Sequence, residues 1–155
     1  MADYETESTP FADRFDAELA QWMTSNRQEM LAGVPGFLGI RLVDASPGFI
    51  AAELEVRPDL LNPFGAMHGA TLAALVDHVL GSAVFPLVPR GTWPATLEFK
   101  LNYLAPVRSG IVRAESRVVA LRARTAVVQV DVTNAGQLIG TALGTISLNP
   151  PKPTT

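Results

Sequence analysis

One carboxylate stands in surroundings that make it unexpected. Asp77 lies in the middle of GATLAALVDHVLGSAVF (residues 69–85), an otherwise apolar run of helical length. Because an unpaired buried carboxylate is costly, Asp77 either has a structural hydrogen-bond partner or faces a ligand on which it does acid–base or nucleophilic chemistry. Most residues three, four and seven positions away are small, which leaves space on this face: Ala70, Ala73, Ala74, Gly81 and Val84.

A second feature comes directly before this run. Residues 62–69, NPFGAMHG, place turn formers ahead of the helix and a glycine in its first turn. The free N–H groups of a helix N-terminus point at anions or polarised carbonyl groups, and Gly69 would let a ligand approach without a Cβ in the way. An ordinary helix-capping loop fits the same residues.

Gly69 and Asp77 are too far apart to act on one small group within a single chain. The eight-residue separation spans about 12 Å at roughly 1.5 Å per residue. If both act on one carbonyl group, a second subunit must supply one of them. We therefore predict a dimer with sites across its interface.

The two histidines are weaker candidates. His68 lies about 180° round a helix from Asp77, so the pair cannot form an acid–base couple within the chain. His78 points about 100° away from Asp77 and is better explained by packing or hydrogen bonding.

The residues needed for metal binding, for a cysteine or serine nucleophile and for a nucleotide-binding loop are missing from the sequence. The chain has no cysteine, no His-x-x-x-His spacing, no Gly-x-Ser-x-Gly elbow and no phosphate-cradling glycine loop, so we predict no metal site and no nucleotide-type loop. The net charge of −3 argues against a nucleic-acid binder. We expect no transmembrane helix, and the acidic N-terminus does not resemble a signal peptide, which favours a cytoplasmic protein.

Arginine forks suit phosphate groups, and seven bases stand against two acids in residues 90–124. Arg113 and Arg117 alternate outward in a strand and are expected on a solvated sheet face. Four others lie near turns and are the phosphate candidates: Arg90, Arg108, Arg122 and Arg124.

The chain has 155 residues, which is enough for one domain that holds these groups in place. Its residues are 48% hydrophobic and 17% charged, a composition that excludes intrinsic disorder. Residues 1–9 read as a flexible acidic arm, residues 10–148 as the domain, with an N-terminal helix over 10–32, and residues 149–155 as a tail. Helix 68–85 lies between strand-like segments with a period of two, and it should be enclosed because it is apolar nearly all round. We predict an α+β fold, a long central helix wrapped by an antiparallel sheet. The expected strands are 38–44, 50–57, 96–103, 112–118, 126–133 and a weaker one at 138–148.

These residues together carry a resemblance. Asn62, the run His68-Gly69-Ala70, Asp77 and the segment TLEFKLNYLAP (residues 96–106) resemble the phenylacetate-pathway (PaaI-like) type of hotdog-fold acyl-CoA thioesterase. The likeness covers about residues 36–148. It implies the hotdog fold, which agrees with the architecture expected from periodicity.

The resemblance also implies roles for five residues. Asp77 would be the catalytic carboxylate, as nucleophile or general base, and Gly69 the backbone amide that polarises the thioester carbonyl from the opposite subunit. Asn62 and His68 would line that end of the site. Thr96 would help to position water near the carboxylate.

It further implies dimers that pair into homotetramers, with coenzyme A along the subunit interface and no separate cofactor. Ala70 replaces the usual second glycine and would trim the acyl pocket, which bears on the substrate more than on the reaction. Five apolar residues could line the acyl pocket or belong to the core: Phe64, Met67, Phe85, Trp93 and Leu97.

Two other functions remain open at this point. A non-catalytic acyl-CoA-binding or interaction module could keep the same fold, and it would bind acyl-CoA without turnover. A hydratase or dehydratase of 3-hydroxyacyl thioesters fits less well, because the spacing of His68 and Asp77 does not match the acid and histidine of those enzymes.

Overall fold

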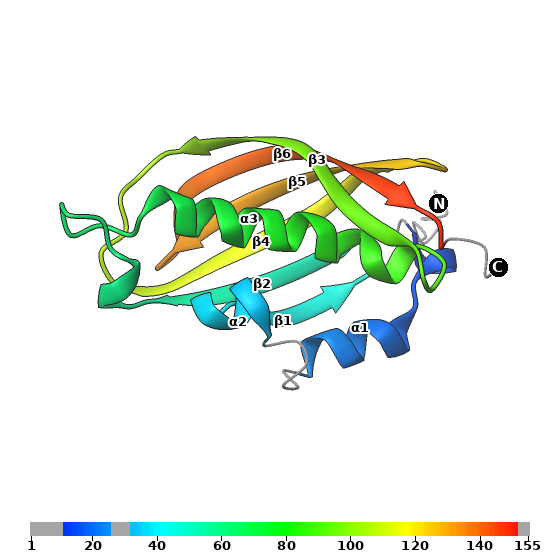
Figure 1. The fold of residues 1–155 in the computed structure, drawn as a ribbon, viewed down its shortest axis with the longest axis horizontal. Coiled ribbons are helices and arrows are strands. Elements are labelled where there is room, and N and C mark those ends of the chain that lie inside the picture. Colours follow the sequence, from blue (N-terminus) through cyan, green and yellow to red (C-terminus); the bar gives the residue numbers. More distant parts are fainter. Residues whose placement is uncertain (1–10, 26–31, 152–155) are drawn as a thin grey trace, which may run out of the picture.

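The computed structural model describes residues 11–25 and 32–151, so the expected arm at residues 1–9 lies outside it. Six antiparallel strands form one curved sheet, and the long helix α3 (Gly69–Val84) lies along one of its faces (Figure 1). The predicted α+β architecture is confirmed. The strands, in the order β1-β2-β4-β5-β6-β3 across the sheet, are β1 (Arg41–Ser46), β2 (Phe49–Val56), β4 (Gly110–Leu121), β5 (Thr125–Asn134), β6 (Gln137–Asn149) and β3 (Trp93–Tyr103).

The central strands follow the period-two pattern of the sequence. In β5 every second residue, Ala126, Val128, Val130 and Val132, is buried against α3 or its neighbours. Such β-branched side chains pack well on a pleated surface.

Strand β6, expected to be the weak one, is the longest of the six described strands at 13 residues. Gly140 and Gly144 lower its local strand propensity. Pairing with β5 on one side and β3 on the other nevertheless holds its backbone in two hydrogen-bonded ladders. Tertiary pairing therefore overrides a weak local signal.

The single helix expected over residues 10–32 is not formed. A 3₁₀ turn (Ala12–Arg14) comes first, and α1 (Ala17–Thr24) begins only after Asp16. Asp16 has an extended backbone, and its carboxylate accepts a hydrogen bond from the Leu19 N–H at 2.9 Å. This N-cap breaks the helix that the apolar spacing suggested. The part of the prediction on residues 26–31 lies outside the described residues.

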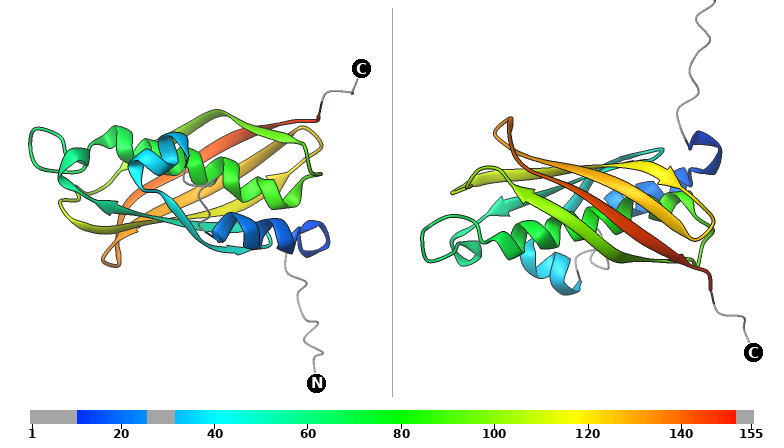
Figure 2. Two further views of the ribbon diagram at one scale, coloured as in Figure 1. Left: turned by 60° about the horizontal axis from the view of Figure 1, so that its bottom comes forward. Right: turned by 90° about the horizontal axis from the view of Figure 1, so that it is seen from above.

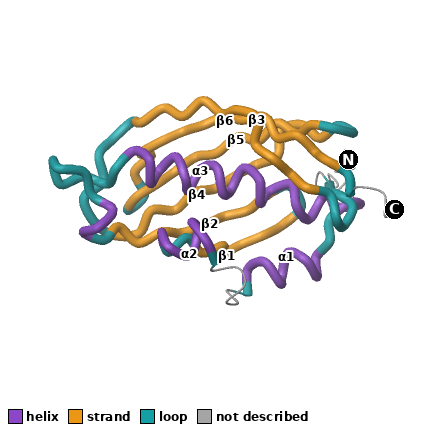
Figure 3. The backbone as a smooth tube through the Cα atoms, in the orientation of Figure 1, coloured by secondary structure: helices purple, strands orange, loops and turns teal. Residues whose placement is uncertain are grey.

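A second short helix, α2 (Gly33–Leu38), occupies residues that were expected to end a helix and begin a strand. Pro35 is tolerated because it lies in the first turn, where an N–H has no intrahelical partner. Gly39 ends α2 with a left-handed φ of 77°, and β1 therefore begins at Arg41 rather than at residue 38. Figures 2 and 3 show α1 beside the β1 edge of the sheet, whereas α2 packs against α3.

The sheet covers only one face of α3, so the expectation of an enclosed helix is wrong for a single chain. Leu75, Val76, Val79 and Leu80 are fully buried. Asp77 is exposed on the other face, where the side chains are small. The sequence of α3 predicted enclosure because alanine and glycine count as apolar residues, although they expose little apolar surface that needs burial.

By length and mean hydropathy (1.5) alone, the segment Gly69–Leu87 could span a membrane. Of its most apolar window, 61% is buried inside the fold. Packing against the sheet therefore accounts for its hydropathy.

The tight packing around Gly144 in β6 yields a stability prediction. A Cβ on Gly144 would stand 2.9 Å from Leu80 Cδ1 and from Phe99 Cβ, and 3.0 Å from the Glu98 carbonyl oxygen. Gly144→Ala must therefore push strands or helix apart, and we expect urea unfolding to show a loss of about 1–3 kcal/mol. Leu143→Thr, on the solvent side of the same strand, is the control and should change stability by less than about 1 kcal/mol. Equal losses in the two variants would contradict the packing argument.

Candidate active site

Asp77 opens onto an apolar pocket of about 660 Å³ that lies between α3, the start of β3 and α1. Thr96 lines the same pocket, beside a bulge in β3. Of the apolar candidates, Phe85 and Trp93 line it as well. The full lining is Trp22, Met23, Asp77, His78, Gly81, Ser82, Phe85, Trp93, Pro94, Ala95 and Thr96.

Leu97 is not among these residues. The bulge between Thr96 and Glu98 shifts the register of β3, and the Leu97 side chain is exposed.

His78 forms part of the wall next to Asp77. Burial lowers the pKa of the His78 imidazole, and the Asp77 carboxylate opposes this by raising it. With the pKa lowered, the His78 ring is neutral at neutral pH.

A second pocket, of about 310 Å³, lies at the N-terminus of α3. Asn62, Met67 and Gly69 line it, together with Tyr103 from β3. As the first residue of α3, Gly69 has an N–H group without an intrahelical partner. This pocket therefore presents a hydrogen-bond donor at the positive end of a helix dipole.

Three side chains fix the start of α3. The Asn62 carboxamide oxygen accepts hydrogen bonds from the backbone N–H groups of Phe64 (2.9 Å) and Ala66 (3.3 Å), which closes the turn before the helix. His68 is the N-cap, and its Nδ1 accepts from the Ala70 N–H at 3.0 Å.

Tyr103 is the third, and the sequence analysis did not single it out. Its hydroxyl donates to the Gly69 carbonyl oxygen at 3.1 Å, and a Cβ at residue 69 would come within 3.3 Å of its ring. Its place seven residues after Thr96 in the same strand was the available signal, but only the register of β3 brings it to the helix start.

The two pockets share no lining residue within the part of the chain that the structure describes. One chain therefore carries a carboxylate pocket and a separate N–H pocket. Ala70, on the exposed face of α3, lines neither of them, and Phe64 projects from the turn with its side chain exposed.

The arginines expected to bind phosphate differ in their surroundings. Arg90 is held by its own chain, with Nε 2.8 Å from Asp16 and a terminal nitrogen 3.0 Å from Glu18. The hydrogen bond from Arg90 lowers the pKa of the Asp16 carboxyl. Arg108 is exposed and donates to the carbonyl oxygens of Phe64 (3.2 Å) and Gly65 (3.1 Å).

Arg122 and Arg124 lie elsewhere. With Arg14 they line a third pocket, of about 340 Å³, beyond the C-terminal end of α3. Both side chains are exposed there.

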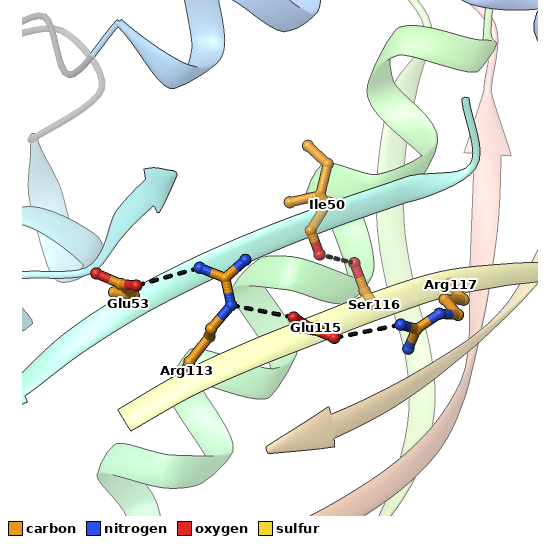
Figure 4. Close-up of polar contacts among 6 residues, drawn as sticks. All are labelled: Ile50, Glu53, Arg113, Glu115, Ser116 and Arg117. Carbon is orange, nitrogen blue, oxygen red and sulfur yellow. Dashed lines mark hydrogen bonds and ion pairs between the residues drawn. The ribbon is translucent and has the colours of Figure 1, made fainter. Parts of the chain in front are cut away.

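Arg113 and Arg117 lie on the outer face of the sheet, as predicted. Arg113 bridges Glu53 (3.1 Å) and Glu115 (3.0 Å), and Arg117 bonds Glu115 at 3.2 Å (Figure 4). Hydrogen bonds from Arg113 and then Arg117 lower the pKa of the Glu115 carboxyl. In the same strand Ser116 points inward and donates to the Ile50 carbonyl oxygen at 2.9 Å. Among residues 11–25 and 32–151, no three acidic or histidine side chains gather closely enough to hold a metal ion.

Comparison with known proteins gives consistent matches. A model of the thioesterase superfamily matches residues 64–141, which contain both Gly69 and Asp77. The human acyl-coenzyme A thioesterase 13 is 31% identical over 103 residues, covering 64% of this chain and 73% of that protein.

Solved structures agree. Thioesterase HI1161 from Haemophilus influenzae is similar with a TM-score of 0.74 at 27% identity, over 86% of this chain and 90% of that one. A variant of phenylacetic acid degradation protein PaaI from Thermus thermophilus is similar with a TM-score of 0.67 at 31% identity, over 73% and 96% of the two chains. The hotdog fold and the likeness to PaaI-type proteins are thereby confirmed.

The partly buried position of His78 predicts a pH effect on stability. Since burial lowers its pKa, the folded protein binds this proton less readily than the unfolded chain, whose histidine titrates near about pH 6.5. Stability from this group is complete above that pH and is lost as the pH falls toward the folded pKa. We expect the free energy of unfolding to fall between about pH 7 and 5.5, by at most about 1.4 kcal/mol per pH unit.

His78→Gln should flatten that part of the profile in urea titrations, because the titrating ring is gone. Carboxylates such as Asp16 titrate at lower pH and leave this window unaffected. An unchanged slope in the variant would show that His78 is not the group responsible.

Proposed function

Because the chain belongs to the thioesterase superfamily and is a thioesterase, we propose that it hydrolyses acyl-coenzyme A at a site that two subunits build together. The observation that carries this proposal is the separation of two half-sites on one chain, the Asp77 pocket and the Gly69 pocket. The Asp77 pocket has the carboxylate, and the Gly69 pocket has the N–H donor of the helix start. A thioester carbonyl needs a carboxylate on one side and an N–H donor on its oxygen.

In the proposed reaction Asp77 of one subunit acts on the carbonyl carbon. Either its carboxylate attacks directly, forming an anhydride that water then hydrolyses, or it takes a proton from water as the water attacks. In both routes the carbonyl π electrons move to oxygen, the C–S bond breaks, and coenzyme A leaves as a thiol after gaining a proton. Thr96, in the same pocket, is suited to orient the water. Water is the sole co-substrate, so no cofactor is required.

The oxyanion is stabilised by the Gly69 N–H of the second subunit. A preorganised donor of this kind is typically worth about 10²–10³ in rate. Asn62, His68 and Tyr103 serve this group indirectly, because their hydrogen bonds hold the start of α3 in place. A fixed donor costs no reorganisation when charge develops.

Self-association is supported by the surface around α3. Strand β3 is an unpaired edge of the sheet, and Trp93, Leu97 and Tyr103 on it are 67%, 62% and 57% exposed. Open edges with apolar side chains favour pairing with another chain. The small residues of α3, Ala70 included, allow a second copy to come close. We extend the proposal to a homodimer, paired into a homotetramer, in the cytoplasm.

The phosphates of coenzyme A need cationic partners outside the apolar pocket. Arg108, beside the turn before α3, and the exposed pair Arg122 and Arg124 are our candidates. Arg90 is the weakest of the four expected from sequence, because Asp16 and Glu18 already occupy its guanidinium.

The carboxylate can be tested by an isosteric change. We expect Asp77→Asn to lower kcat for thiol release from acyl-CoA by about 10²–10⁴, with an unchanged fold by circular dichroism. Asp44→Asn, the same change at an exposed position of β1, should retain full activity. Full hydrolysis by Asp77→Asn would refute the proposed chemistry, and acyl-CoA binding without turnover by the wild type would favour a binding module.

The shared site can be tested with residue 69. Proline is well tolerated at the first position of a helix but has no N–H, so Gly69→Pro should remove the donor and keep the helix. Gly69→Ala places the same Cβ near the Tyr103 ring and keeps the donor, which makes it the matched control. We expect a loss of about 10²–10³ in kcat for Gly69→Pro beyond any loss in Gly69→Ala.

Mixing the two inactive variants then tells where the site lies. A dimer of one Asp77→Asn chain and one Gly69→Pro chain has one intact site if the halves come from different subunits. Random re-pairing of equal amounts should restore about a quarter of wild-type activity. No recovery in verified mixed dimers would mean that each site lies within one chain.

A further inference from the structure

We propose that α1 is a specificity element of the acyl pocket, in which the Trp22 side chain limits the length of the acyl group. The inference rests on the proposed function, because it names what bounds the acyl group at that site. Helix α1 lies outside residues 64–141, the segment that the superfamily model matches.

Helix α1 supplies a wall of the pocket that holds Asp77. Trp22 and Met23 both line this pocket, although more than fifty residues separate them from Asp77 in the sequence. Met23 is only 4% exposed and packs into the core, whereas Trp22 is 40% exposed. Trp22 thus borders both the pocket and the solvent, which is the place where a longer acyl group would have to leave.

The wall is fixed in position by contacts outside the pocket. Arg90 pairs with Asp16 and Glu18 at the start of α1, and the Asp16 N–H donates to the Pro86 carbonyl oxygen at 2.8 Å. Pro86 and Arg90 belong to the connection that follows α3. These bonds tie α1 to the end of the helix that carries Asp77, so the distance from the carboxylate to the indole is set by the fold.

Gly81 leaves part of the pocket wall without a side chain. Gly81 lies one turn after Asp77 on α3 and also lines the pocket. A Cβ built there would have no atom within 4 Å, so residue 81 faces open space. A larger side chain at this position would fill the pocket without a clash in the chain itself.

The chemistry of the lining favours an apolar acyl group. The rings of Trp22, Phe85 and Trp93 surround a volume of about 660 Å³, within the range of ordinary ligand pockets. Each buried methylene should raise kcat/KM by about fourfold until the chain reaches the wall, after which added length gives no gain.

The test is a series of straight-chain acyl-CoA substrates from butyryl to palmitoyl, with kcat/KM measured for each. We expect the optimum of Trp22→Ala to move to longer chains by at least about two carbons, and that of Gly81→Leu to move to shorter chains. Activity on the shortest substrates should stay within about twofold of wild type in Trp22→Ala, because the Asp77 end of the pocket is untouched. Gln21→Ala, on the exposed side of α1, is the matched control and should keep the wild-type optimum.

The ion pairs of Arg90 with Asp16 and Glu18 allow a second, independent test. Arg90→Gln removes the ion pairs that hold α1, so we expect a broader chain-length profile with little change in kcat for the shortest substrate. Arg41→Gln removes an exposed ion pair on β1 instead and should leave the profile unchanged. Light scattering checks that every variant keeps its assembly. If Trp22→Ala does not, Trp22→Phe replaces it, with a smaller shift in the same direction.

The outcomes separate this inference from the proposed function. If Trp22→Ala hydrolyses the series with the wild-type optimum, the role of α1 is refuted and the thioesterase proposal stands. If the wild type hydrolyses none of these thioesters, the proposed function fails. Calorimetric affinities for the same series then decide on α1, since Trp22→Ala must shift the preferred length for the inference to hold and an unchanged preference overturns it.

Discussion

The packing of α3 into the curved sheet is the interaction on which the rest of the structure depends. Leu75, Val76, Val79 and Leu80 of the helix are fully buried against the sheet, and a Cβ on Gly144 would stand 2.9 Å from Leu80 Cδ1. This contact orients the helix about its axis. The helix groups that the proposed reaction uses lie away from this contact: the Asp77 carboxylate, the small residues beside it and the N–H at the helix start. The apolar core thus determines where the chemistry is presented without taking part in it.

The start of α3 shows how a fold prepares a backbone group. A helix N-terminus offers free N–H groups wherever it occurs, but these are useful only if they stay in place. Here the Asn62 carboxamide closes the turn before the helix, and the His68 imidazole caps its N-terminus. The Tyr103 hydroxyl bonds the carbonyl oxygen of its first residue, Gly69. None of the three needs to touch a substrate. Their proposed contribution is rigidity, which is why their residue types alone point equally well to an ordinary cap.

Charged residues serve mainly as structural ties in this chain. Arg113 and Arg117 join neighbouring acids on the outer face of the sheet, and Arg90 joins α1 to the segment after α3. Exposed pairs of this kind contribute little stability each, but they fix geometry. Ion pairs therefore account for three of the seven bases in residues 90–124, namely Arg90, Arg113 and Arg117. Arg108, Arg122 and Arg124 are the ones proposed to bind phosphate.

The α+β architecture, the central helix and the family resemblance could be predicted from the sequence, because hydrophobic periodicity and the spacing from Asn62 to Asp77 are local properties of the chain. The sequence also implied that Gly69 and Asp77 cannot meet within one subunit, since helix rise alone sets their separation. Three features could be seen only in the folded chain: Asp77 is exposed, the Tyr103 hydroxyl bonds the helix start, and α1 forms a wall of the carboxylate pocket. Those facts depend on strand register and on contacts between distant segments, and such contacts leave no periodic trace in the sequence.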